Sequence, residues 1–365
     1  MISIIGAGPA GSAAAYLLAK AGKDVTIYEE HGSVGEPVQC TGIVTSALNK
    51  LVKPSPEFIV NEIRYARIYS PAGKNIEIKM AKPNLIIDRW AFDNYLCDKA
   101  EAAGARLALN SRFLGFSGDK LRIKNKQTQK LVSIASSIVI GADGPQSPVA
   151  KSAGIFGSRE LLTGVQAVAY MKNDNAVEFY PYINTFGWVV PENEGRVRIG
   201  VLGKHNTVAS FKKLLKLKGV KDKHIIEKQG GVVPIYSNKL RTCSISRNRR
   251  VYLVGDAAAQ VKATTGGGIV PALIAAKCLA DSIIHNRDYE KEWKKELGRD
   301  LWLHLAARRV MDRFSYKDWN RMIEIFSRPK NRKVLEEIDR DNPSSLFMKL
   351  AMQEPGLWRF ARKLF

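Results

Sequence analysis

Three adjacent glycines, Gly266–Gly268, are the residues of this chain best suited to a close approach between backbone and ligand. Without a Cβ, a glycine backbone can lie directly against a flat molecule. The apolar run Ile269–Ala280 is predicted to be a helix whose first N–H groups and positive dipole end face that molecule. Upstream, Gly255 and Asp256 end the strand-like run Val251–Val254, and the carboxylate suits a sugar hydroxyl. A carboxylate for a polyol beside a helix start for an electron-rich ring indicates a flavin site.

A second glycine-rich turn lies at the start of the chain. It separates the strand-like run Ile2–Ile5 from the helix-like run Ser12–Ala21, which is the context that a dinucleotide-binding fingerprint requires. The next strand, Asp24–Tyr28, delivers Glu29, whose carboxylate can accept hydrogen bonds from both ribose hydroxyls. The alternative is a turn with no role in ligand binding. The residues of the turn expected to bind the cofactor are Gly6, Gly8, Ala10 and Gly11.

A third motif lies between these two. The apolar run Ser137–Ile140 is followed by Gly141-Ala142-Asp143-Gly144. The three motifs, in this order over residues 6–256, resemble the three fingerprints of the flavoprotein hydroxylase superfamily typified by para-hydroxybenzoate hydroxylase. In that superfamily all three bind FAD, and the middle one is also implicated in binding the reductant. The resemblance implies FAD as the cofactor, with Asp143, Gly144, Gly255 and Asp256 among the residues that bind it.

The loop Val34–Gly42 resembles a loop of the geranylgeranyl reductase family, in which a cysteine follows a Gly-x-Pro-Val-x pattern. The matching residues are Gly35, Pro37, Val38 and Cys40. The resemblance implies that Cys40 lies beside the isoalloxazine, where it can donate a proton or tune the site, and that Thr41 and Ile43 supply backbone contacts. The family often has glycines at these last two positions. The alternative for Cys40 is an inert core thiol.

The segment Phe186–Pro191 resembles the YxWxFP signature of the same family, with Phe186 for Tyr and Val190 for Phe. By this resemblance Trp188 forms a wall of the substrate site. Such a wall suits a polyprenyl chain, because each buried CH₂ contributes about 0.8 kcal/mol. The alternative is that Trp188 only fills the core between the two lobes. Flavin halogenases have a related WxWxIP pattern, but its first Trp is absent here.

Further cofactor contacts follow from the same resemblance. Arg89, in Ile86–Asp93, matches an arginine that contacts FAD, and a guanidinium can neutralise a pyrophosphate; a surface ion pair is the alternative. Phe113 matches a position whose backbone meets the adenine. The resemblance places Asp256 near the ribityl chain. Gly268 and Ile269 are assigned to the pyrimidine edge, and Gly267 is also expected to bind the cofactor. Before these glycines, Lys262-Ala263-Thr264-Thr265 stands where the family usually has a proline.

Composition agrees with a multi-lobed enzyme. The chain has 365 residues, 45% of them hydrophobic, and its mean hydropathy is −0.17. No run of roughly 18 apolar residues predicts a membrane span, and the immediate N-terminal strand leaves no room for a signal peptide. The four cysteines show no CxxC spacing, so we expect neither disulfides nor a metal site, and a cytoplasmic location.

The net charge of +22 is concentrated in one region. Residues 204–250 contain 13 Lys or Arg and only 2 Asp or Glu. Within them, 211–218 has apolar residues at helical spacing between lysines, a pattern typical of a membrane-surface or anionic-ligand contact. A solvated basic face is the alternative. A high pI also invites nucleic acid, but no nucleic-acid motif accompanies the charge, so no nucleic-acid partner is expected.

The predicted fold class is α/β: a Rossmann-like FAD-binding lobe, an inserted antiparallel β-sheet substrate lobe and a C-terminal helical region. The runs Ile63–Tyr69 and Asn75–Met80 flank the turn signal Ser70–Gly73 and predict a hairpin of the inserted sheet. The predicted domains are 1–50, 84–157 and 243–285 for FAD, 51–83 and 158–242 for the substrate sheet, and 286–365 for a helical cap.

The most specific functional prediction is an FAD-dependent reductase that saturates C=C bonds in geranylgeranyl chains of membrane lipids or their precursors. An FAD monooxygenase acting on an apolar or aromatic substrate is the second interpretation, and a non-catalytic FAD-containing lipid- or RNA-binding protein is the third. The partners expected are a polyprenyl lipid and an electron donor, which a nicotinamide, a deazaflavin or a ferredoxin could supply. The cytoplasmic protein would contact the inner membrane face through residues 204–250.

Overall fold

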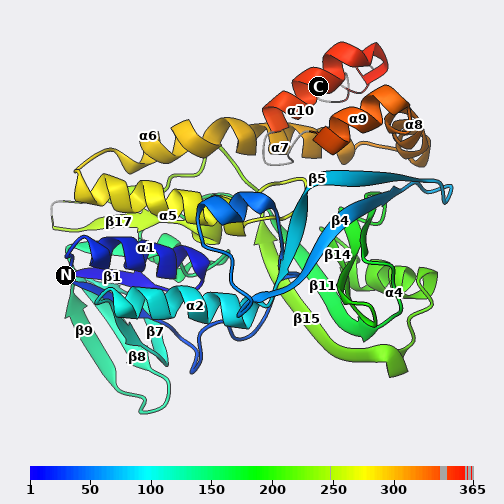
Figure 1. Cartoon of the computed structure of the whole chain (residues 1–365). Helices are drawn as coiled ribbons and strands as arrows, with labels where there is room; N and C mark the ends of the chain where they lie inside the picture. Colours follow the sequence, from blue (N-terminus) through cyan, green and yellow to red (C-terminus); the bar gives the residue numbers. More distant parts are fainter. Residues whose placement is uncertain (247, 338–342, 358–359, 361–362, 364–365) are drawn as a thin grey trace.

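The protein consists of two large sheets side by side, with a row of C-terminal helices along one edge of both (Figure 1). The computed structural model describes residues 1–365 except 247, 338–342, 358–359, 361–362 and 364–365. The larger sheet curls beside the helix-covered smaller one, so the two meet where several loops converge.

The first sheet has six strands, of which all but one edge strand are parallel. The inner strands β1 and β2 are buried at every position, which explains why they are continuous apolar runs without alternation. In spatial order the strands are β16 (Cys243–Ile245), β17 (Arg250–Leu253), β10 (Ile138–Gly141), β1 (Ile2–Ile5), β2 (Val25–Tyr28) and β6 (Arg106–Ala108).

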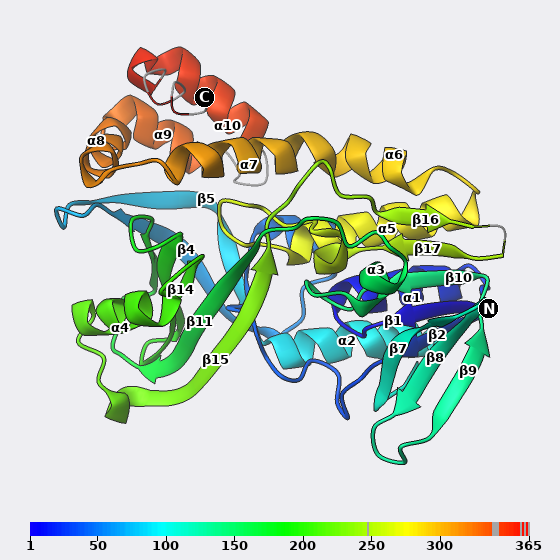
Figure 2. The same ribbon diagram turned by 180° about the vertical axis from the view of Figure 1, so that it is seen from behind.

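Helices and a small sheet cover the two faces of this parallel sheet. One face packs against α1 (Pro9–Lys20), α2 (Arg89–Ala102) and α5 (Ile269–Ile284). The opposite face, seen in Figure 2, carries the short α3 and a three-stranded antiparallel sheet. Their bounds are α3 (Pro148–Ser152), β7 (Ser111–Ser117), β8 (Lys120–Asn125) and β9 (Leu131–Ala135).

The second sheet has eight strands, antiparallel except where β12 and β4 run parallel. Helix α4 (Thr207–Leu217) packs on its outer face through Phe211 and Leu214. In spatial order the strands are β15 (Ile225–Pro234), β11 (Leu161–Tyr170), β14 (Arg196–Gly203), β13 (Phe186–Asn193), β12 (Ala176–Tyr180), β4 (Ile59–Tyr69), β5 (Asn75–Ile87) and β3 (Ile43–Val44).

The C-terminal region is helical in its described residues. Its helices run along the upper edge of both sheets in Figure 1, and α9 packs against β5. A turn of π-helix, Lys294–Gly298, connects the first two helices. The helices are α6 (Tyr289–Trp293), α7 (Arg299–Met311), α8 (Tyr316–Phe326), α9 (Pro329–Glu337) and α10 (Pro343–Gln353).

The predicted α/β class with an inserted antiparallel sheet is confirmed. The predicted hairpin is longer than expected, because β5 continues to Ile87. Consequently the end of β5, together with β3, lies in the large sheet, although the predicted ranges 1–50 and 84–157 assign these residues to the FAD lobe. Because β5 spans 13 residues and continues past the predicted limit at residue 84, the boundary between the two lobes does not fall there. The domain limits as such stay a prediction.

Candidate active site

The three glycine motifs of the sequence meet at one edge of the parallel sheet. Ile5, Gly141 and Leu253 end neighbouring strands in direct register. The backbone continues the pairing beyond the strands, since Ala142 donates to the Ile5 carbonyl at 2.8 Å and Val254 to the Gly141 carbonyl at 3.0 Å. The carboxyl ends of parallel strands are where open α/β sheets bind their ligands.

The first glycine turn forms a cradle with one open position. A Cβ on Gly6 would lie 2.5 Å from the Ala142 carbonyl oxygen, and one on Gly11 would collide with Gly6. By contrast, a Cβ on Gly8 would have no atom within 4 Å. Gly8 is also the N-cap of α1, and no side chain caps that helix. The helix therefore presents free N–H groups to open space, which is what a pyrophosphate requires.

Glu29 closes the cradle at the end of β2. Its Oε2 accepts a hydrogen bond from the Ala7 backbone at 2.8 Å, and its Oε1 contacts the backbone N–H and the Nδ1 of His31 at 3.0 and 2.7 Å. The carboxylate is thus fixed at the glycine turn, in the place expected for a ribose contact. His31 was not predicted, although a histidine two residues beyond the acidic residue is visible in the sequence.

A buried charge pair lies beside the Cys40 loop. Arg89 donates to Asp93 through Nε at 3.0 Å and Nη2 at 2.8 Å, one turn apart on α2. Burial lowers the pKa of the Arg89 guanidinium, but the Asp93 carboxylate and the Cys40 thiol outweigh that effect, so the pKa is raised. Arg89 thus forms an ion pair and a cysteine contact within the protein, and the Arg89 charge also reaches Asp256.

Asp256 and the glycine loop come together at the N-terminus of α5. A Cβ on Gly268, the N-cap of α5, would lie 2.8 Å from Asp256 Oδ1. Burial raises the pKa of Asp256 to about 6, and Arg89 opposes this shift. The loop before α5 is a tight hairpin, since Lys262 pairs with Gly267.

Asp143 has a local structural role. Its two carboxylate oxygens accept hydrogen bonds from Ser147 Oγ at 2.6 Å and the Val149 backbone at 2.8 Å, so it orders the start of α3. Burial raises its pKa to about 6 despite these donors. Phe113 lies farther away in β7, with its side chain buried in the core between the parallel and the three-stranded sheets. A cofactor contact by either residue stays a prediction.

A buried arginine holds the Cys40 loop against the large sheet. Arg198, on β14, donates through Nη1 to the carbonyls of Thr41 at 2.6 Å and Ile87 at 3.0 Å, and its Nε donates to Glu192 at 2.7 Å. The Thr41 carbonyl is therefore occupied, and the backbone of Ile43 pairs with Ile86. Any backbone contact of these two residues with a cofactor must use the remaining groups.

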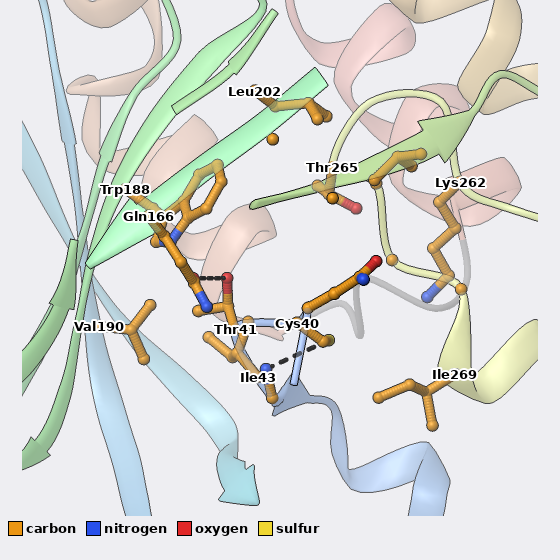
Figure 3. Close-up of a pocket in the computed structure, with 18 of the residues that line it drawn as sticks. Cys40, Thr41, Ile43, Gln166, Trp188, Val190, Leu202, Lys262, Thr265 and Ile269 are labelled. Atoms are coloured by element: carbon orange, nitrogen blue, oxygen red, sulfur yellow. Dashed lines mark hydrogen bonds between the residues drawn. The ribbon is translucent and has the colours of Figure 1, made fainter. Parts of the chain in front are cut away.

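A cavity of about 200 Å³ opens between the glycine loop, the Cys40 loop and the large sheet (Figure 3). Trp188 forms one wall, packed flat against Gly200 of the next strand and 5.2 Å from the Phe186 ring between centroids. The apolar residues that line the cavity are Ile43, Val44, Val165, Phe179, Phe186, Trp188, Val190, Leu202, Val233, Ile269, Val270 and Pro271. The cavity thus brings Cys40, Trp188 and Gly268, predicted from distant motifs, to one place.

Polar side chains cross the floor of this cavity. Thr41 Oγ1 donates to Gln166 Oε1 at 2.8 Å, as Figure 3 shows, and Gln166 in turn bonds to Gln229 on β15. His304, buried on α7, also lines the cavity and lies 2.7 Å from Thr264 Oγ1. The sequence contains a signal for two of these residues: Gln166 and Arg198 interrupt otherwise apolar strands, which is unusual for buried positions.

Comparison with known proteins agrees with this geometry. The strand-end motifs, the open helix N-termini and the roofing sheet define an FAD-binding flavoprotein, and the profile of the FAD binding domain family matches residues 1–285. The chain is 30% identical to the digeranylgeranylglycerophospholipid reductase of Methanothrix thermoacetophila, over 95% of this chain and 97% of the relative. It is 27% identical to the enzyme of the same name from Methanocaldococcus jannaschii, over 100% and 97%. The chain therefore belongs to the digeranylgeranylglycerophospholipid reductase family of FAD-binding proteins.

Solved structures share the fold. A geranylgeranyl bacteriochlorophyll reductase-like protein from Thermoplasma acidophilum superposes with a TM-score of 0.86 at 24% identity, over 100% of this chain and 98% of that one. The flavin-dependent halogenase CmlS superposes with a TM-score of 0.67 at 16% identity, over 98% and 78%. The predicted family, the predicted fold and the prediction of FAD are confirmed.

Proposed function

We propose that this protein is an FAD-dependent reductase that saturates C=C bonds in the geranylgeranyl chains of membrane lipids or their precursors. The observation that carries the proposal is the apolar cavity between the N-terminus of α5 and the Trp188 wall. The name printed for the relatives, digeranylgeranylglycerophospholipid reductase, describes a substrate of the same chemistry.

The walls suit an isoprenoid chain. Such a chain offers only apolar surface and double bonds, and each CH₂ that it buries contributes about 0.8 kcal/mol. Phe179, Phe186 and Trp188 provide aromatic surface on the side of the large sheet, and Ile269 and Pro271 provide aliphatic surface on the side of α5. The hydrogen-bonded side chains of Thr41, Gln166 and Gln229 would restrict the isoprenoid chain to the apolar part of the cavity.

Besides the cofactor, three features of the protein would serve the reaction: Cys40, the N-terminus of α5 and the apolar walls of the cavity. Reduced FAD supplies a hydride when bound. Cys40 lies in the lining of the cavity and would donate the proton that an unactivated double bond needs at the same time. The N-terminus of α5, capped by Gly268, carries free N–H groups and the positive end of the helix dipole. There it would stabilise negative charge on the flavin. The apolar walls would exclude water from the reaction.

The decisive experiment is anaerobic incubation of dithionite-reduced, FAD-loaded protein with a geranylgeranylated glycerophospholipid, followed by mass spectrometry. The expected result is a gain of two hydrogen atoms for each reduced double bond. A product that gains oxygen when air is admitted, together with rapid oxygen consumption, would indicate the monooxygenase instead. Bleaching of the flavin by a nicotinamide, a reduced deazaflavin or a reduced ferredoxin identifies the electron donor.

The lipid substrate implies contact with a membrane surface, and we assign that contact to α4. Lys212, Lys213 and Lys216 are exposed on this helix, and Val208 and Leu217 are exposed hydrophobic residues at its two ends. Basic residues beside exposed apolar ones are typical of helices that lie on anionic lipid. In the described part of the chain, no helix has the length and apolarity needed to cross a membrane.

A further inference from the structure

A second cavity, of about 290 Å³, lies next to the apolar one and has a different chemical character. Its lining includes three cationic side chains, two carboxylates and four hydroxyl groups. The polar residues are Lys204, Arg308, Arg309, Glu160, Asp312, Ser158, Thr185, Ser237 and Tyr236, and the remaining residues are Leu162, Ile235 and Leu305.

The two cavities are adjacent along four separate elements. At the end of β14, Leu202 lines the first cavity, and Lys204, directly after the strand, lines the second. At the start of β13 the corresponding neighbours are Phe186 and Thr185, the residue before the strand. At the end of β15 they are Val233 and Ile235, the residue after the strand. On α7 they are His304 and Arg308, which lie one turn apart on the same face. The polar cavity therefore lies next to the apolar one, beside α7 and the ends of these strands.

The charges of the second cavity favour an anion. Arg308 is buried, pairs with Asp312 at 2.8 Å and donates to the Thr185 carbonyl at 3.0 Å, so it is held in place. Lys204 pairs with Glu160, and both side chains are nearly half exposed, so this pair borders solvent. Both carboxylates thus already have cations.

Arg309 supplies the additional cation. It is exposed, and among the described residues it has no carboxylate within ion-pair distance. Its guanidinium, with the hydroxyls of Tyr236, Ser158 and Ser237, forms the donor set that a phosphate group requires. The neighbouring hydroxyls can also bond to the oxygen atoms of a glycerol unit.

We propose that the second cavity binds the phosphate-bearing head group of the lipid whose prenyl chain occupies the apolar cavity. The proposal rests on the proposed function for the identity of the lipid, but it concerns binding and does not depend on reduction. The head group sits at the solvent-bordered end, and the double bonds extend past Leu202 and Phe186 toward Cys40. The shared chemistry is a phosphate ester, which a lipid or a small phosphate could supply.

Calorimetric titration of the oxidised, FAD-loaded protein tests the proposal without any turnover. The probes are a geranylgeranylated glycerol phosphate in detergent below its micellar concentration and the same molecule without phosphate. Arg309→Ala and the double variant Arg309→Ala/Lys204→Ala are expected to bind the phosphorylated lipid about tenfold more weakly, the loss of a charge-assisted hydrogen bond. Their affinity for the unphosphorylated lipid should stay unchanged.

Arg321→Ala is the matched control, because this exposed arginine pairs with Glu324 on α8 outside both cavities. It should leave both affinities as in the wild type. Equal weakening for both lipids, or no weakening, would overturn the proposal. Glycerol 3-phosphate separates the two phosphate sources: competition with the lipid supports a head-group site, and binding without competition overturns it. Selective lipid binding in a protein that reduces no double bond would leave the head-group site intact and refute only the reductase.

Discussion

Cys40 differs from two other cysteines of the chain in its surroundings. Its Sγ accepts a hydrogen bond from the Gly42 backbone at 3.4 Å, lies beside Arg89 and borders the apolar cavity. Burial raises the pKa of Cys97 to about 12 and that of Cys278 to about 11, which is typical of inert thiols. The position of Cys40 thus supports the hypothesis of a proton donor.

Replacing Cys40 tests this role directly. Cys40→Ser is expected to retain FAD and lipid binding but to lose alkene reduction by about 100-fold, the usual contribution of a general acid. Single-turnover reoxidation of the reduced flavin by lipid measures the effect. Cys278→Ser, within α5 and outside the lining of the cavity, is the control and should react at the wild-type rate. Full activity of Cys40→Ser would remove this thiol from the mechanism.

The buried carboxyl of Asp256 makes the stability of the flavin-free protein depend on pH. Burial raises its pKa from 3.8 to about 6, so the folded chain binds this proton more tightly than the unfolded chain does. The resulting stabilisation is complete below about pH 4 and is lost as the pH rises through 6. The contribution of this carboxyl to the stability of the flavin-free protein should therefore increase as the pH falls from neutral.

Asp256→Asn keeps the side chain neutral at every pH. The flavin-free variant is expected to melt at a higher temperature than the wild type at about pH 8, and the difference should shrink at about pH 5. FAD affinity should fall, since the carboxylate is lost. Asp98→Asn, on the exposed side of α2, should shift the melting temperature equally at both pH values. A pH-independent gain for Asp256→Asn would contradict the assigned cause.

At the scale of elements, two glycines at the N-terminus of α1 have different surroundings, so their replacement should affect ligand binding and folding differently. Gly8 has φ −69°, which any residue adopts, and an added Cβ would meet no protein atom. Gly11 is packed against Gly6 and has no room for one. Gly8→Ala should therefore leave the flavin-free fold within about 0.5 kcal/mol of the wild type, and Gly11→Ala should unfold it.

FAD content distinguishes the two variants. Gly8→Ala is expected to purify folded but colourless, because the methyl group occupies the space that the pyrophosphate needs. Circular dichroism measures the fold and absorbance near the flavin bands measures the cofactor. A yellow Gly8→Ala protein with normal affinity would show that the pyrophosphate does not approach α1 at this residue.

The contact between the Cys40 loop and β14 depends on Arg198. Arg198→Met removes the hydrogen bonds to the carbonyls of Thr41 and Ile87 and leaves Glu192 with only its weaker partner Arg196, at a cost of about 2 kcal/mol. The additional change Glu192→Gln should restore part of the stability. Arg198 is a positioning residue, so the double variant should regain stability but not the loop geometry.

The alkylation rate of Cys40 by iodoacetamide reports the loop position apart from stability. It is expected to differ from the wild-type rate in both Arg198 variants and to be partly restored in Arg198→Lys. Arg67→Met, which breaks a more exposed ion pair with Asp174 on the same sheet, is the control. Unchanged alkylation in the Arg198 double variant would assign Arg198 to stability only.

At the scale of the whole molecule, the positive charge is less uniform than the sequence indicates. Lys218 pairs with the buried Glu178 at 2.7 Å, and Lys204 pairs with Glu160. Exposed lysines of α4 and the loop after it remain for an external partner. Helix α4 lies on the outer face of the large sheet, far from the three-stranded sheet, in both views (Figures 1 and 2).

Charge reversal on α4 tests membrane contact. Lys212→Glu, Lys213→Glu and Lys216→Glu together should abolish co-sedimentation with anionic vesicles, since each basic residue near the surface contributes about 1 kcal/mol. Reversal of Lys120, Lys126 and Lys130, exposed at the opposite end of the molecule, is the matched control. If both triple variants lose binding equally, net charge and not α4 attracts the lipid.

Local patterns predicted Glu29 and the glycine motifs that meet at one edge of the parallel sheet. Glu29 and the three strand-end motifs are each specified by a strand, a turn and a helix start within about 30 residues, as such units are. The curled sheet was predicted as a class, but the partners of its strands were not, because pairing between β4 and β12 joins segments about a hundred residues apart. Periodicity carries no information on such register.

The sequence alone determined the family and the FAD cofactor, and it predicted Cys40 and Trp188 for one site, because glycine turns, strand ends and signature loops are local. Only the tertiary structure decided that Arg198 holds the Cys40 loop, that Gln166 and His304 line the cavity, and that a charged cavity adjoins the apolar one. These contacts join strands and helices whose neighbours are set by sheet register and helix packing, and side chains far apart in the chain meet only after both have formed.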